Sequence, residues 1–69
     1  MKLSARNQIK GKIVDVKTGA TTSHVTVDVG GGVQLFASIT NEAVTDLDLK
    51  VGLTVTAVIK ASDVMIATD

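Results

Sequence analysis

The sequence predicts an all-β fold with one short helix, because apolar and polar residues alternate, β-branched residues are frequent, and glycines separate the runs. The alternation is clearest from His24 to Val29, where a valine stands at every second position. Gly30 to Gly32 follow this run and favour a hairpin turn, since glycine readily adopts the backbone conformations of tight turns. The alternating run from Val33 to Thr40 is therefore expected to return antiparallel to the preceding strand.

Three further runs have the composition of strands. Residues 8–16 combine the β-branched Ile13, Val14 and Val16 with the interleaved polar Lys10, Lys12 and Asp15. Residues 54–59 are dense in β-branched side chains, and residues 64–67 form a short apolar run. Turn signals lie at Lys17 to Ala20 and at Ala61 to Asp63. The expected strands are thus residues 8–16, 24–29, 33–40, 54–59 and 64–67.

A short helix is expected between the third and fourth strands. Thr40 or Asn41 can cap its first turn, Glu42 is favourably placed near the positive end of the helix dipole, and Gly52 ends the pattern. Its apolar side is expected to consist of Ala43, Val44 and Leu47. Five strands with one short helix between strands three and four are the element order of a five-stranded OB-type barrel, which is the predicted fold.

The length of the chain predicts one domain spanning residues 1–69 and a need for stabilisation by other copies. Sixty-nine residues bury a small share of their surface, there is no cysteine for a disulfide, and Phe36 is the sole aromatic residue. Hydrophobic residues nevertheless make up 45% of the sequence. That much apolar surface indicates burial between subunits, so a homo-oligomer is expected.

The charge balance argues against nucleic acid and membrane partners. Seven Lys and Arg residues balance seven Asp and Glu residues, and the two signs are interspersed along the chain. Base stacking on single strands requires aromatic platforms, and only Phe36 could provide one. No export signal and no apolar run near the roughly 20 residues of a membrane-spanning helix is visible, so the cytoplasm is the expected location.

The sequence contains no recognisable catalytic or metal-binding constellation, and no enzyme activity is expected. His24, the sole histidine, lies on the polar phase of its strand, where a solvated or interfacial role is expected. The acidic residues lack the spacing of a metal loop. Gly30 to Gly32 are followed by a strand instead of the lysine and helix of a phosphate-binding loop. No free metal ion and no cofactor is therefore expected.

Two polar segments could bind a tetrahedral oxyanion. Ser4 to Gln8 precede the first strand, and Lys60 to Ser62 follow the fourth; both are rich in hydroxyl, amide and cationic donors. A tetrahedral dianion is best held by several converging neutral donors with one or two cations. Residue chemistry alone favours simpler roles for these segments, as a strand lead-in and a solvated turn.

The same segments carry a family resemblance. Ser4 to Gln8, followed by Ile9 and Gly11, resemble the SARNQ-x-x-G opening of the molbindins, molybdate-binding proteins built from a Mop or TOBE domain. The run from Lys60 to Met65 is similar to the K-[AS]-[ST]-x-V-M ending of that family. The resemblance also includes Gly30-Gly31, Ile39-Thr40 and Val51-Gly52, and so extends over essentially the whole chain.

The resemblance implies an OB-type barrel that assembles as a homohexamer, a trimer of dimers, and holds molybdate or tungstate between subunits. Some relatives have a serine at the position of Ala43, whose methyl group cannot donate to an anion. Thr40 or the backbone at the helix start could substitute, or binding could be weaker. The residues implied for this main site are Ser4, Ala5, Arg6, Asn7, Thr40, Lys60, Ala61 and Ser62, and those for a second oxyanion site are Gly19, Ala20, Thr21 and Thr22.

The predicted function is cytoplasmic binding, with storage or buffering, of molybdate or tungstate at the subunit interfaces of a homo-oligomer. The alternative is an OB-type module for nucleic-acid or protein interaction, in which Ser4 to Gln8 are purely structural.

Overall fold

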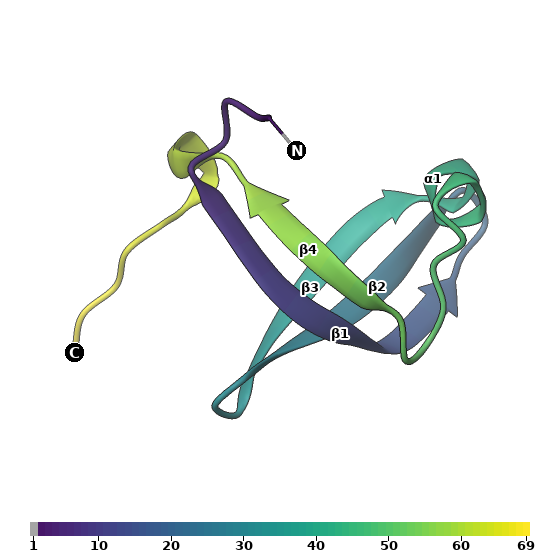
Figure 1. The fold of residues 1–69 in the computed structure, drawn as a ribbon, viewed down its shortest axis with the longest axis horizontal. Helices are drawn as coiled ribbons and strands as arrows, with labels where there is room; N and C mark the ends of the chain where they lie inside the picture. Colours follow the sequence, from purple (N-terminus) through teal and green to yellow (C-terminus); the bar gives the residue numbers. More distant parts are fainter. Residues whose placement is uncertain (1) are drawn as a thin grey trace.

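The computed structural model describes residues 2–69, which form a four-stranded antiparallel sheet with one short helix. The strand order is β3-β2-β1-β4, so β3 and β4 are the two edges (Figure 1). The elements are β1 (Asn7–Thr18), β2 (Thr22–Gly30), β3 (Val33–Thr40), α1 (Asn41–Asp46), β4 (Thr54–Ile59) and the 3-10 turn η1 (Ala61–Asp63). No helix within residues 2–69 has the length and apolar character needed to cross a membrane.

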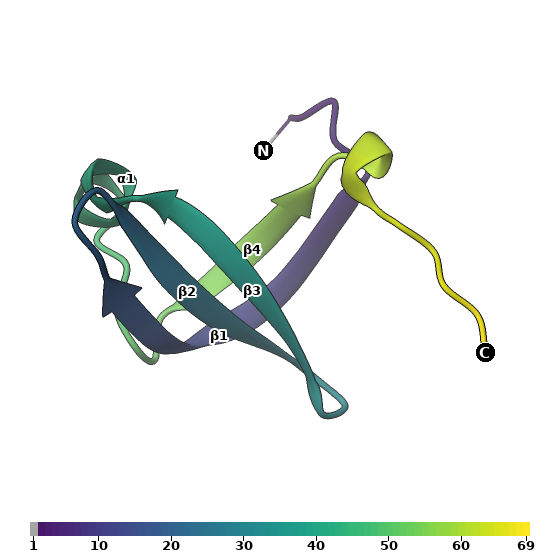
Figure 2. The ribbon, with the colours of Figure 1, turned by 180° about the vertical axis from the view of Figure 1, so that it is seen from behind.

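The prediction of an all-β fold with one short helix is confirmed, but the fifth strand and the closed barrel are not formed. Residues 64–69 pair with no strand, and the side chains of Met65 and Ile66 are 93% and 86% exposed. After η1 the chain runs away from the sheet, as Figures 1 and 2 both show. A run of four residues with β propensity becomes a strand only where it can pair with the edge of a sheet. Within this chain residues 64–67 pair with neither open edge, β3 or β4.

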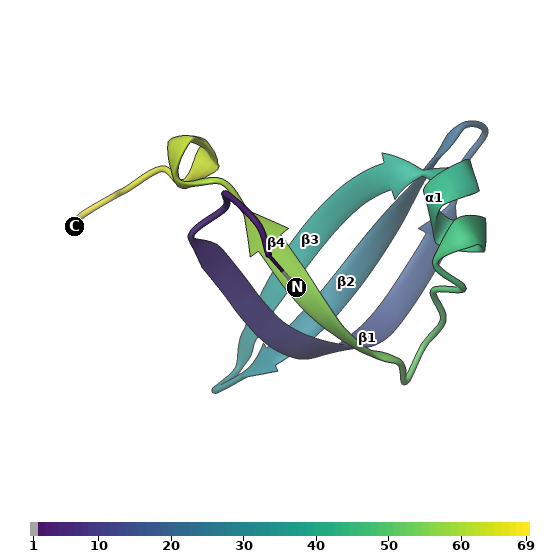
Figure 3. The same cartoon turned by 45° about the horizontal axis from the view of Figure 1, so that its top comes forward.

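β1 extends beyond its predicted range of 8–16 and belongs to both halves of the sheet. Its first half pairs with β4, its second half pairs with β2, and Lys12 takes part in both pairings. The register with β2 shifts between Ile13 and Asp15, and such a bulge bends a strand. Figure 3 shows the resulting curve of β1, which lets β4 and the β2–β3 hairpin form the two arms of a folded sheet.

The close approach of β1 to β2 requires the glycine at position 11. A Cβ atom there would lie 2.6 Å from Val27 Cγ1 and 2.7 Å from the Asp28 carbonyl oxygen. We expect Gly11→Ala to lower the free energy of unfolding by about 1–3 kcal/mol, because the strands must move apart. Urea denaturation measures this loss. Lys10→Ala, at the neighbouring exposed position of β1, is the control and should change stability little.

The inner face of the folded sheet is apolar and open. Ile13, Val25 and Val27 are its buried core. They line the floor of a hollow of about 680 Å³, whose sides are formed by residues of β3 and β4. We call this hollow the apolar trough; its lining includes Leu35, Ala37, Ile39, Leu47, Leu49, Leu53, Val55, Ala57 and Ile59. Because it opens between the two unpaired edges, one chain leaves much of its apolar surface exposed.

The capping of α1 agrees with the prediction, whereas its apolar side differs in part. Thr40 is the N-cap, and its hydroxyl oxygen accepts a hydrogen bond from the Ala43 N–H at 3.1 Å. Ala43 and Val44 are half-buried as expected. Leu47, expected on the same side, is exposed at the rim of the apolar trough, because the trough has no cover in a single chain.

Candidate functional site

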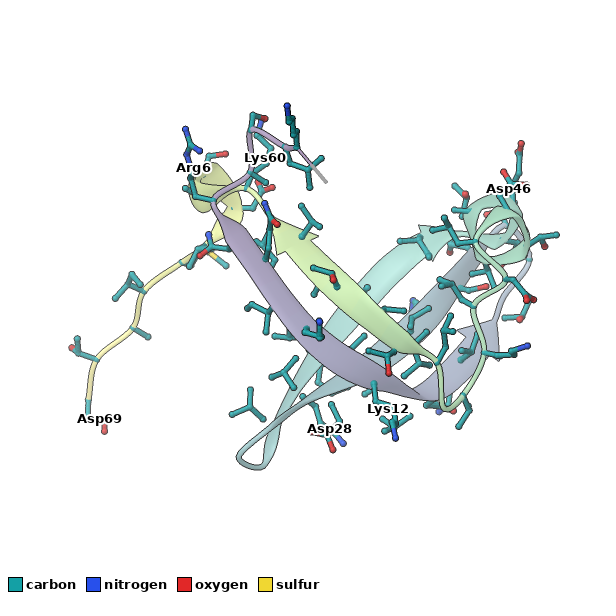
Figure 4. All side chains as sticks on the ribbon, viewed as in Figure 1. Arg6, Lys12, Asp28, Asp46, Lys60 and Asp69 are labelled. Carbon is teal, nitrogen blue, oxygen red and sulfur yellow. The ribbon has the colours of Figure 1, made fainter. Side chains whose placement is uncertain are left out.

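The pairing of β1 with β4 brings the two main-site segments together. Asn7 lies opposite Ile59 at the end of this ladder, so Ser4 to Arg6 and Lys60 to Ser62 continue from adjacent strand ends. Figure 4 shows Arg6 and Lys60 at this same end of the molecule. Residues from the beginning and the end of the chain thus form one cluster of donors.

The first segment is held by one buried residue and leaves its polar groups outside. Ala5 is buried, and its carbonyl accepts a hydrogen bond from Gln8 Nε2 at 3.3 Å. Ser4 and Arg6, on either side of Ala5, are exposed, while Asn7 is half-buried at the start of β1. The buried Ala5 therefore fixes the backbone from which the side chains of Ser4 and Arg6 extend into solvent.

The second segment forms a tight turn whose first N–H groups stay available. In η1 the Asp63 N–H donates to the Lys60 carbonyl at 2.9 Å, and the Val64 N–H donates to the Ala61 carbonyl at 3.3 Å. Within residues 2–69 the backbone N–H groups of Ala61 and Ser62 have no such acceptor. Over the same range, neither Lys60 nor Arg6 forms a salt bridge. The cluster therefore combines two unpaired cations with hydroxyl and backbone donors.

Thr40 lies apart from this cluster within one chain. It pairs with Thr22 at the other end of the sheet, next to the turn that contains the predicted second site. Figure 4 shows the separation, with Asp46 of α1 labelled far from Arg6 and Lys60. The structure thus groups Thr40 with Gly19, Ala20, Thr21 and Thr22, and not with the other main-site residues of the same chain.

A side chain that the sequence did not nominate for either site organises this second end. Asn41 donates from its backbone N–H to the Thr21 carbonyl at 2.9 Å and from Nδ2 to the Gly19 carbonyl at 2.9 Å. Its Oδ1 accepts a hydrogen bond from the hydroxyl of Ser23, which is fully buried. We call these three hydrogen bonds the Asn41 bracket. Nothing local in the sequence signals it, because Gly19 and Asn41 belong to separate hairpins and meet only through the fold.

The remaining polar candidates lie elsewhere. His24 is exposed and stands in a cross-strand row with Lys17 of β1 and Ser38 of β3. The Gly30 to Gly32 turn joins β2 to β3 with positive φ angles, as a hairpin turn and not a phosphate-binding loop. Across residues 2–69, no three His, Cys, Asp or Glu side chains are placed to hold a metal ion.

The family model of the TOBE domain matches residues 3–66 of this chain. The chain belongs to the TOBE-domain family. Membership of the molbindin (Mop/TOBE) group, predicted from the Ser4 to Gln8 and Lys60 to Met65 segments, is confirmed by this match and by the relatives. Molybdenum-pterin-binding protein 3 of Clostridium pasteurianum is 47% identical over 66 residues, which cover 96% of this chain and 97% of the relative.

Two solved structures of this TOBE group resemble the chain throughout. MopII from Clostridium pasteurianum has a TM-score of 0.90 and 42% identity, covering 97% of this chain and all of that one (100%). A molybdate binding protein from Sporomusa ovata has a TM-score of 0.92 and 34% identity, covering 99% and 100% of the two chains. The open four-stranded sheet with one short helix is therefore the fold of a TOBE-domain chain.

Proposed function

We propose that this TOBE-domain protein binds molybdate, with tungstate as the second ligand, and that it stores or buffers the oxyanion in the cytoplasm without catalysing a reaction. The observation that carries the proposal is the β1–β4 register, which places Ser4 to Asn7 beside Lys60 to Ser62. The printed names of its relatives support the ligand, since they bind molybdate or molybdenum-pterin.

The donor set suits a tetrahedral dianion. Lys60 and Arg6 carry the two positive charges that balance it, and hydroxyl and backbone N–H groups supply directional hydrogen bonds. Neither Ser4 to Asn7 nor Lys60 to Ser62 contains a carboxylate side chain, and the first acidic residue after them is Asp63 in η1. A phosphoryl or acyl transfer site would need a nucleophile activated by a neighbouring base. Ser4 and Ser62 could be nucleophiles, but the two segments contain no histidine or carboxylate to activate them.

The exposure of the donors supports a site completed by a second copy. Both Arg6 and Lys60 are exposed, and exposed ion pairs are weak because water and salt screen them. Excluding water from the anion requires another surface over the cluster. In the proposed site this surface belongs to a neighbouring subunit, so that binding and assembly depend on each other.

The apolar surface of the chain supports the same assembly. The apolar trough lies open between the edges of β3 and β4, and the exposed run of Val64, Met65 and Ile66 follows directly after η1. In the proposed dimer each chain inserts this run into the trough of its partner, where it supplies the missing fifth strand. Three such dimers form the proposed homohexamer.

Thr40 takes part in the proposed main site only from a neighbouring subunit, because its own chain places it at the opposite end. Its oxygen already accepts the capping hydrogen bond from Ala43, so the hydroxyl hydrogen remains free to donate. In the proposed site this donor takes the place of the serine hydroxyl that the family resemblance implies for some relatives at the position of Ala43. The second oxyanion site is proposed at Gly19 to Thr22, also at a contact between subunits.

Titration calorimetry with sodium molybdate, sodium tungstate and sodium sulfate tests the proposal. We expect heat from the first two anions and much weaker binding of sulfate, because a cavity sized for the larger anion holds the smaller one poorly. Native mass spectrometry of the same samples reports subunit number and anion count together. No binding of molybdate, or tight salt-dependent binding of a single-stranded oligonucleotide instead, would overturn the proposal.

Ile66→Asp is expected to weaken subunit association by at least roughly tenfold, since the trough loses an apolar side chain and would have to bury a charge. Size-exclusion chromatography with light scattering at several protein concentrations measures the change. Thr68→Asp adds the same charge two residues further along the exposed tail and serves as the control. Equal association of the two variants would show that residues 64–66 do not fill the trough.

A further inference from the structure

The structure points to Asn41 as the positioning residue of the second oxyanion site, an inference that rests on the function proposed above. Asn41 itself does not touch the anion in this arrangement. Its role is to orient the turn at residues 19–22, so that backbone donors of the turn face the ligand.

The bracket holds two carbonyl groups of the turn. The Gly19 carbonyl accepts from Asn41 Nδ2, and the Thr21 carbonyl accepts from the Asn41 backbone N–H, each at 2.9 Å. All described peptide bonds are trans, so the N–H of each peptide group points opposite to its carbonyl. The N–H groups of Ala20 and Thr22 therefore point away from the Asn41 groups that hold these carbonyls.

These N–H groups join side-chain donors at the same place. Ala20, Thr21 and Thr22 are all exposed, and two of them carry hydroxyl groups. Within residues 2–69 the Ala20 N–H has no backbone acceptor. An unpaired backbone N–H beside two hydroxyl groups is a set of neutral donors of the kind that holds tetrahedral anions. The turn thus presents neutral donors, and a cation would come from a neighbouring chain.

The turn cannot hold this conformation by its own contacts alone. Gly19 donates to the Thr22 carbonyl at 2.8 Å, and a Cβ atom at Gly19 would lie 2.7 Å from that oxygen, so the chain is tight there. The Gly19 carbonyl depends on Asn41, and Asn41 in turn is oriented by the buried hydroxyl of Ser23. The Gly19 carbonyl can only accept, so the amide end that faces it is Nδ2, and the Ser23 hydroxyl anchors the opposite Oδ1 end.

Substitutions at Asn41 and Ser23 test whether the Asn41 bracket orients the turn. Asn41→Asp keeps the acceptor for Ser23 and removes the Nδ2 donor to the Gly19 carbonyl, but its carboxylate also repels an anion. The neutral variant Ser23→Ala therefore decides between lost orientation and added charge. Thr45→Ala is the matched control, because the Thr45 hydroxyl donates to the Asn41 carbonyl at 3.2 Å and has no contact with the turn. Both variants lose one hydrogen bond to Asn41, but only the first loses the bracket.

Equilibrium dialysis of the assembled protein against molybdate, with metal analysis and native mass spectrometry, counts anions in each class. We expect wild type to show two classes, and Asn41→Asp to weaken the second class by at least roughly tenfold while leaving the first within about twofold. Thr45→Ala should leave both classes unchanged. Ser23→Ala, which frees the amide to rotate, should weaken the second class in the same direction and serves if Asn41→Asp does not fold.

Three outcomes separate this inference from the proposed function. If wild type binds no molybdate, the proposed function fails and this inference fails with it. If wild type binds a single class that depends on Lys60, the function stands and the inference is overturned. If Asn41→Asp and Thr45→Ala weaken both classes equally, or if neither bracket variant affects the second class, Asn41 has only a structural role and the inference is likewise overturned.

Discussion

Replacing Lys60 with glutamate is expected to weaken molybdate binding by at least roughly 100-fold, the largest loss of affinity from any single change in the main site. Lys60 directly follows Ile59, which pairs with Asn7, so its ammonium group lies at the junction of the two donor segments. A carboxylate there would replace attraction for a dianion by repulsion at short range. Titration calorimetry with molybdate measures the loss.

Lys10→Glu is the matched control for this charge reversal. Lys10 is exposed on β1 and pairs with Thr56, several residues before the end of the β1–β4 ladder. Both variants change the net charge by the same amount, so a general electrostatic effect would appear in both. A comparable loss in Lys10→Glu would contradict a local role for Lys60, and intact binding in Lys60→Glu would remove Lys60 from the site.

Ile13→Ala is expected to lower the free energy of unfolding by about 2–5 kcal/mol, a large fraction of the stability of so small a domain. Ile13 is only 1% exposed and forms the floor of the apolar trough with Val25 and Val27. Its backbone also joins the two arms, donating to the Leu53 carbonyl at 3.0 Å and accepting from the Gly52 N–H at 2.8 Å. The cavity left by alanine therefore lies where the halves of the sheet meet.

Urea denaturation followed by circular dichroism measures this loss at a fixed protein concentration, since association contributes to stability. Val14→Ala is the control, because Val14 is the next residue along β1 and its side chain is 39% exposed. Its cost should stay below about 1 kcal/mol. Equal destabilisation by both variants would show that burial at position 13 is not the source of the effect.

The features that could be predicted from the sequence are those specified by local patterns. Alternation located β2 and β3, the triple glycine located their turn, and Thr40 was one of the two caps expected for α1. The grouping of Ser4 to Asn7 with Lys60 to Ser62 was implied by the family resemblance, and the β1–β4 register brings the segments together. The oxyanion and its donors at this cluster remain a proposal.

The features that could not be predicted depend on partners distant in sequence. Residues 64–67 have strand composition, but whether they form a strand depends on an edge that their own chain does not bring to them. Thr40 was assigned to the main site by resemblance, and only the pairing with Thr22 shows that one chain keeps it at the other end. The Asn41 bracket was missed because an asparagine after a threonine predicts a helix start and nothing further away.

The position of the main site at the meeting point of the first and last strands has a consequence for how the protein matures. The β2–β3 hairpin closes across a short glycine turn, which costs little loop entropy, so it can form early. β4 and the Lys60 to Ser62 turn are synthesised late, and only then can they pair with the start of β1. A growing chain on the ribosome therefore offers molybdate no complete donor set. In the proposed function the ligand therefore acts on the folded chain, and it stabilises that state because it binds only there.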